Sequence, residues 1–217
     1  MSSLMTTTQT VMHLSHLSYA LSKKVSESNQ QAFCIVLANN AQVTQAYNEM
    51  SLFLNAQDRQ RLLVLPDWET LPYDAINAHR HITARRMQTL YQLTQSNAPI
   101  LLTSTTAYLQ TIVPRSFITR ECFLCQVGQT MHIEQFREQM IAKGYDEVPE
   151  VSETGQFAIR GSILDVILDE NNILGYRIEL FDNEVDSIRI LDVQTNRSHK
   201  KINAINILPS REYNSKN

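Results

Sequence analysis

Glycine is scarce in this sequence of 217 residues, and the first 127 residues hold none of its five glycines. A loop that cradles a nucleotide phosphate needs glycine, because its backbone takes up positive φ and comes close to the phosphate oxygens. This absence excludes a Walker A loop from the first half of the chain. We therefore expect a protein that is not an enzyme, with no catalytic residues and no cofactor.

Cysteine and long apolar runs are scarce as well. Three cysteines, an odd and low number, are typical of a reduced protein and not of a disulfide scaffold. No apolar run approaches the roughly 18 residues that cross a bilayer. The first ten residues lack the basic side chains of a secretory signal. We expect a cytoplasmic, monomeric protein that makes no contact with a membrane.

The sequence also lacks an excess of basic residues. It contains 19 Lys and Arg and 22 Asp and Glu, for a net charge of −3. Residues 1–120 hold 9 basic and 6 acidic side chains, whereas residues 121–217 hold 10 and 16. This asymmetry indicates two units with different surfaces. Direct nucleic-acid binding by the basic first half stays an alternative, with Arg80, Arg85 and Arg86 as its patch. A solvated helix face is the favoured interpretation of those three residues.

Hydrophobic periodicity in the first half predicts strands alternating with helices. We expect strands at 33–38, 62–65 and 99–103, and helices at 11–25, 41–54, 80–93 and 105–112. This alternation is typical of a parallel sheet with helices on its faces. We predict an α/β domain over residues 1–121.

The second half predicts a small α+β domain with an antiparallel sheet over residues 122–211. One helix begins near Ile133 and ends before Gly144, which is expected at the position just after the helix. Strands follow at about 145–148, 156–167, 176–182 and 185–192, with Asp182 and Asn183 as a turn. Residues 212–217 are expected to form a polar, frayed tail.

Two motifs suggest chemistry but are weak. Cys122 and Cys125 form a CxxC pair, but a zinc site needs four ligands and the sequence has no second pair. We expect no metal there. The apolar strand that ends at Asp67 resembles a degenerate Walker B end, which leaves a degenerate ATPase as a third alternative. His79 and His81 are interpreted as surface residues.

The strand at 176–181 is more informative. Period-two alternation gives one face with Tyr176, Ile178 and Leu180, and another with Arg177, Glu179 and Phe181. The first set is typical of side chains that point into a hydrophobic core. The second places an aromatic residue among charges, which Arg160 on a neighbouring strand would join. Arginine and aromatic residues are enriched at binding hot spots; a phenylalanine covered by a helix of its own domain is the equal alternative.

Several segments resemble the bacterial transcription-repair coupling factors (Mfd). They include LPDWETLPYD at 65–74, GQFAIRGSILD at 155–165, YRIELFDNEVDSIR at 176–189 and ILPSRE at 207–212. These segments keep the order and spacing of that family. The chain departs from the family's usual residues at His81, at Gln156 and at Ile167 with Leu168.

The resemblance implies a UvrB-like first domain without a working nucleotide site, then an inserted domain that binds UvrA. It assigns UvrA contacts to Arg160, Arg177 and Phe181. It implies that RNA polymerase and DNA are contacted by the remainder of a full-length, ATP-dependent DNA translocase, of which this chain is a fragment or a natural truncation. The expected function is a non-catalytic adaptor in nucleotide excision repair.

Overall fold

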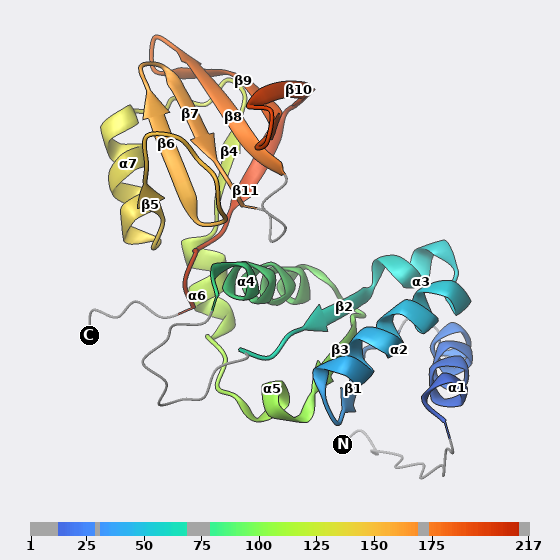
Figure 1. Ribbon diagram of the computed structural model, residues 1–217. Helices are drawn as coiled ribbons and strands as arrows, with labels where there is room; N and C mark the ends of the chain where they lie inside the picture. The colour runs from blue at the N-terminus through green and yellow to red at the C-terminus, as the bar shows by residue number, and fades with distance from the viewer. Residues whose placement is uncertain (1–12, 29–30, 69–78, 169–173, 213–217) are drawn as a thin grey trace. The chain divides into compact units, whose positions relative to one another are not determined.

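The computed structural model of the chain describes residues 13–28, 31–68, 79–168 and 174–212 (Figure 1). By spatial contact the chain divides into a first unit, Met1–Leu65 with Ser96–Leu109, and a second unit, Pro66–Gln95 with Gln110–Asn217. This grouping follows the fold and not the order of the chain. The sequential division into domains at residue 121 stays a prediction.

The first unit is built on a parallel sheet in the order β1-β3-β2. Its strands are β1 (Phe33–Leu37), β2 (Leu62–Leu65) and β3 (Ile100–Ser104), and its helices are α1 (Leu14–Glu27), α2 (Asn40–Phe53), α3 (Ala56–Gln60) and α5 (Thr105–Leu109). The α/β class expected from the periodicity is confirmed. Its core combines strand residues such as Ile35 and Leu102 with Val25 of α1 and Met50 of α2.

The helix expected at 105–112 is shorter than predicted, and another helix follows it. Helix α5 ends at Leu109, and α6 (Arg115–Glu121) begins after Pro114. Proline disfavours helical geometry at the residue before it, yet its own fixed φ suits the start of a helix. Pro114, with φ of −66°, therefore begins α6, which the hydrophobic pattern did not predict.

The second unit contains a six-stranded sheet in the order β10-β9-β8-β7-β6-β5 and a two-stranded sheet of β11 and β4. Its elements are α4 (Arg80–Gln95), α6, β4 (Phe123–Gln126), α7 (Ile133–Ala142), β5 (Asp146–Glu147), β6 (Gln156–Arg160), β7 (Ile163–Val166), β8 (Leu174–Phe181), β9 (Glu184–Asp192), β10 (Arg197–Ile202) and β11 (Ala204–Ile207). All pairs in these sheets are antiparallel except β5 with β6. The small domain with an antiparallel sheet is confirmed, with this one parallel pair as an addition.

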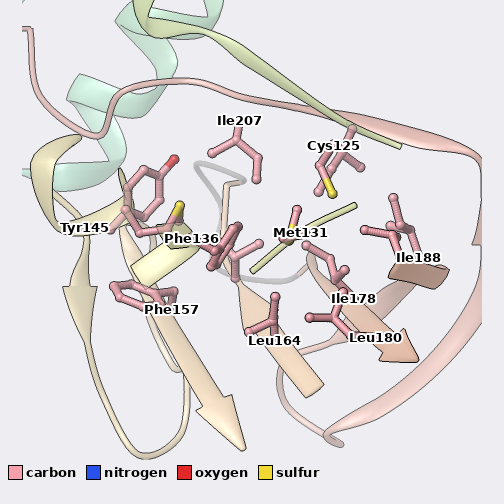
Figure 2. Packing of buried hydrophobic residues seen from close by; sticks show 14 residues of the cluster. Cys125, Met131, Phe136, Tyr145, Phe157, Leu164, Ile178, Leu180, Ile188 and Ile207 are labelled. Atoms are coloured by element: carbon pink, nitrogen blue, oxygen red, sulfur yellow. The ribbon is translucent and has the colours of Figure 1, made fainter. Parts of the chain in front are cut away.

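One face of the six-stranded sheet carries the main core of the second unit, shown in Figure 2. Phe157, Ile178 and Ile188 project from β6, β8 and β9 toward Phe136 of α7 and Ile207 of β11. Helix α7 and the β4–β11 pair therefore cover this inner face. Side chains alternate between the two faces along a strand, so the residues adjacent to these core residues project from the opposite face of the sheet. We call that face the outer face.

The single strand expected at 156–167 is wrong, because the chain folds there into the hairpin β6–β7. Arg160 pairs with Ile163 across a turn in which Gly161 has φ of 62°. This left-handed conformation is open to glycine without steric cost. Apolar residues alternate on both sides of the turn, so the pattern alone conceals it.

Two other turns agree with their sequence signals. Gly144 follows α7 with φ of 88°, and Tyr145 donates its N–H to the Met140 carbonyl at 3.0 Å, closing the helix end as predicted. Asp182 and Asn183 form the two-residue connection between β8 and β9, with φ of 46° and 63°. Two positive φ values define the type I′ turn, which matches the twist of a hairpin.

An ion pair is buried in the second unit between Arg86 of α4 and Glu212. Both side chains are 0% exposed, and Arg86 Nε lies 2.5 Å from Glu212 Oε1. Arg86 also donates to the Pro66 carbonyl at 2.5 Å and lies over the Trp68 ring at 4.6 Å from its centroid. The expectations of a solvated face for Arg86 and of a frayed Glu212 are both wrong, because each charge compensates the other. Residues 213–217 lie outside the described residues.

The helices of the described part of the chain differ from membrane spans in length and polarity. None of them is both long enough and apolar enough to cross a bilayer.

Candidate functional site

The outer face of β6–β9 brings together the charged residues singled out in the sequence. Arg177 is directly opposite Asp165 in the β7–β8 register, and Arg160 ends the neighbouring strand β6. The buried neighbours Leu164 and Ile178 point into the core on the inner face. Strand alternation therefore places Arg160 and Arg177 on one face, as predicted from the sequence.

The two arginines share one carboxylate. Arg177 donates from Nε to Asp165 Oδ1 at 2.7 Å and from Nη2 to Asp165 Oδ2 at 2.9 Å. Arg160 donates from Nη2 to the same Oδ2 atom. The Asp165 carboxylate raises the pKa of Arg177 above its ordinary value, chiefly through these hydrogen bonds. The shared carboxylate thus holds the two guanidinium groups beside each other.

Further polar groups extend this cluster. Arg177 Nη2 donates to Asn196 Oδ1 at 2.6 Å, and Asn196 Nδ2 donates to Glu150 Oε1 at 2.8 Å. On the same face, Glu179 of β8 lies 3.4 Å from Arg189 Nη2 of β9. The outer face therefore carries ionic groups on several strands, beside a small buried apolar cluster that includes Ala158 and Leu191.

Phe181 lies apart from the ionic cluster, at the end of β8 beside the type I′ turn. Its side chain is 71% exposed, so the alternative in which a helix of its own domain covers it is wrong. Phe181 is the fourth residue after Arg177, which is roughly 13 Å along an extended strand. The three predicted residues thus share a face but do not touch: two cations lie at one end and an aromatic ring at the other.

Asp165 was not singled out in the sequence, although it organises this face. It stands in Ile163-Leu-Asp-Val166, where its neighbours Leu164 and Val166 are fully buried. A carboxylate between two core residues is a signal for a paired acid, since an unpaired buried charge is very costly. Its partners are on other strands, so only the sheet register identifies them.

The basic patch proposed for nucleic acid is not assembled in the second unit. Arg86 is buried against Glu212, and Arg80 forms an ion pair with Asp146 and donates to the Gly155 carbonyl at 3.0 Å. Two of its three arginines are therefore engaged within the fold. The separate expectation of a solvated helix face fails for Arg86.

The residues of the two weak motifs, and the two histidines, make contacts within the fold. Asp67 accepts a hydrogen bond from Gln110 Nε2 at 2.7 Å, and the His79 and His81 rings stack with centroids 5.4 Å apart. Cys125 lies on β4 within the core, whereas Cys122 is half-buried just before that strand. Among the described residues, no group of three or more His, Cys, Asp or Glu side chains is placed to hold a metal ion.

The different burial of Cys34 and Cys125 predicts the order in which a thiol reagent labels them. Burial raises the pKa of the Cys125 thiol to about 11, so roughly one molecule in a thousand carries the thiolate at pH 8. Cys34 is exposed on β1. We expect iodoacetamide at pH 8 to label Cys34 first and Cys125 only after denaturation, as followed by peptide mass spectrometry. Equal labelling rates in the native protein would contradict the burial of Cys125.

Comparison with known proteins finds a domain family over the segment that holds the outer face. Residues 124–213 match the UvrB interaction domain family. This segment contains β6 to β9 and with them the whole outer face. The outer face therefore lies within the segment that resembles the UvrB interaction domain family.

Similarity to full-length relatives extends over most of the chain. It is 32% identical over 190 residues to the transcription-repair-coupling factor of Escherichia coli strain K12, and 33% identical over 190 residues to that of Haemophilus influenzae. The Bacillus subtilis transcription-repair-coupling factor is 31% identical over 188 residues. These matches cover 86–88% of this chain but only 15–16% of each relative. The resemblance to the UvrB-like region of transcription-repair coupling factors, expected from the motifs, is confirmed.

Proposed function

We propose that this chain is a non-catalytic adaptor module that recruits UvrA through the outer face of its second unit. The observation that carries the proposal is the presence of two fixed arginines and an exposed phenylalanine on one face of a segment that matches the UvrB interaction domain family. Arginine forks pair with carboxylates in a bidentate manner, and an aromatic side chain gains most by filling an apolar pocket. Arg160, Arg177 and Phe181 are the proposed contact residues.

The wider role that we propose rests on the resemblance to transcription-repair-coupling factors. In a longer protein of this kind, the module would link a stalled RNA polymerase to nucleotide excision repair. RNA polymerase and DNA would be bound by regions outside this chain, where an ATP-dependent translocase activity would also lie. The present chain would act by binding alone.

Titration calorimetry of the chain with purified UvrA tests the proposal. Arg160 is the arginine to reverse, because its side chain is 41% exposed and tolerates substitution better than the more buried Arg177. We expect Arg160→Glu to weaken binding by tenfold or more, since it places a carboxylate where the partner's acidic group docks.

Arg120→Glu is the matched control for this charge reversal. Arg120 lies on α6 in the same unit, and its side chain is 74% exposed. We expect this variant to bind UvrA like the wild type. Absence of wild-type binding, or equal effects of the two reversals, would overturn the proposed site.

A further inference from the structure

Asp165 occupies an unusual place on the outer face. It lies on a central strand of the six-stranded sheet, opposite Arg177 on β8 and diagonal to Arg160 on β6. Although it belongs to the outer face, only 2% of its side chain is exposed. A carboxylate so far removed from water is tolerated only when hydrogen-bonded cations surround it. The two arginines supply that compensation through hydrogen bonds to both carboxylate oxygens.

The contacts fix Arg177 more firmly than an ordinary surface ion pair does. Both Asp165 oxygens accept from Arg177, and Asn196 accepts a third hydrogen bond from the same guanidinium. Arg160 is then drawn to the shared oxygen from the neighbouring strand. An arginine held in one plane loses little rotamer freedom when a partner binds, which is the general advantage of preorganisation.

The charges in this cluster are unequal. Arg160 and Arg177 carry two positive charges, whereas Asp165 supplies one negative charge. Glu179, on the same face, also acts on Arg177 by charge, but it is paired with Arg189 and accepts a hydrogen bond from Ser187 at 2.8 Å. Glu150 reaches Arg177 only through Asn196, so Asp165 is the acid that bonds both arginines directly. Asp165 therefore brings two cations together and neutralises one of them. A carboxylate from a partner is the chemical group that would complete the cluster.

We propose that Asp165 is a positioning residue of the docking surface: its buried carboxylate holds Arg160 and Arg177 side by side to receive one carboxylate of the partner. This inference rests on the proposed recruitment of UvrA and adds both the residue that organises the site and the group it recognises. Asp165 acts through the arginines, because its side chain is buried and both of its oxygens accept hydrogen bonds from them.

A double-mutant cycle measured by calorimetry with purified UvrA tests this inference. Asp165→Asn keeps the shape of the side chain but removes its charge and one acceptor. We expect Asp165→Asn to weaken binding by tenfold or more in the wild-type background. In the Arg177→Gln background the same change should have an effect below threefold, since the arginine through which it acts is gone. A purely structural role would lower the melting temperature without this coupling.

Asp58→Asn is the matched control, because Asp58 is a buried carboxylate in the first unit, 2.6 Å from Arg61 Nη1. It should reduce stability but leave UvrA binding within twofold. If the wild type binds and Asp165→Asn binds equally well, the inference is overturned while the proposed function stands. Full additivity in the double mutant also overturns it. If the wild type does not bind, the proposed function itself fails.

A second measurement decides the positioning role even if Asp165→Asn does not fold. Nuclear magnetic resonance relaxation of arginine Nε–Hε groups reports side-chain order in the wild-type protein. Arg177 should be as rigid as the backbone, whereas exposed Arg197 on β10 should be mobile. Equal mobility of Arg177 and Arg197 would refute the inference without any variant.

Discussion

Replacing Arg86 by alanine is expected to destabilise the second unit by about 3–5 kcal/mol, because it leaves Glu212 buried without its cation. The guanidinium also lies over the Trp68 ring and bonds the Pro66 carbonyl, so the variant loses these contacts too. Urea denaturation followed by circular dichroism measures the loss. Arg120→Ala, in a surface pair with Glu121, is the control and should cost about 0.5 kcal/mol or less.

The loss should also depend on pH. Burial raises the pKa of the Glu212 carboxyl, and Arg86 opposes this rise. Without Arg86 the pKa rises further, so the folded variant binds a proton more readily than the unfolded chain does. Stability of the variant is then greatest at low pH and falls as pH rises through the folded-state pKa. Arg86→Ala should therefore lose less stability at pH 5 than at pH 7.5. A loss below about 1 kcal/mol at pH 7.5 would contradict the buried pair.

Replacing Phe181 by alanine is expected to weaken UvrA binding by roughly thirtyfold, or about 2 kcal/mol, while the fold is retained. Its side chain is 71% exposed, so its removal opens no cavity in the core. A ring that fills a partner pocket loses its whole buried surface on truncation. Titration calorimetry measures the affinity, and circular dichroism checks the fold.

Leu174→Ala is the matched control for Phe181→Ala. Leu174 is an exposed apolar residue at the opposite end of the same strand, β8. If the aromatic residue is a binding anchor, the control should change the affinity by no more than about twofold. Equal affinities of Phe181→Ala and the wild type would remove Phe181 from the proposed site and leave the arginine cluster as its centre.

Period-two alternation along the strand at 176–181 correctly predicts which side chains form the outer face. It separates core from surface because strand side chains project to opposite sides. Burial of Ile178 and Leu180, with exposure of Phe181, follows that rule. The same rule conceals the hairpin at 156–167, because its apolar residues alternate on both sides of the Gly161 turn. It does not predict the strands β10 and β11.

Sequence patterns do not identify interaction partners that lie far apart along the chain. Helix periodicity predicts α4, but it treats Arg86 as a solvated charge because its partner, Glu212, is 126 residues away. The Glu212 side chain is likewise assigned to a polar tail. Polar residues on β10, and its place at the edge of the sheet, make that strand resemble a loop.

The sequence by itself determined the α/β character of the first half, the antiparallel sheet of the second, the absence of glycine from the first 127 residues, the shared face of Arg160, Arg177 and Phe181, and the resemblance to transcription-repair coupling factors. These properties are local: they depend on spacing along the chain and on residue type. Only the tertiary structure decided which charges meet, at Asp165 between two arginines and at Arg86 with Glu212. The physical reason is that the energy of a buried charge depends on groups brought close by folding, and distance along the chain does not record that proximity.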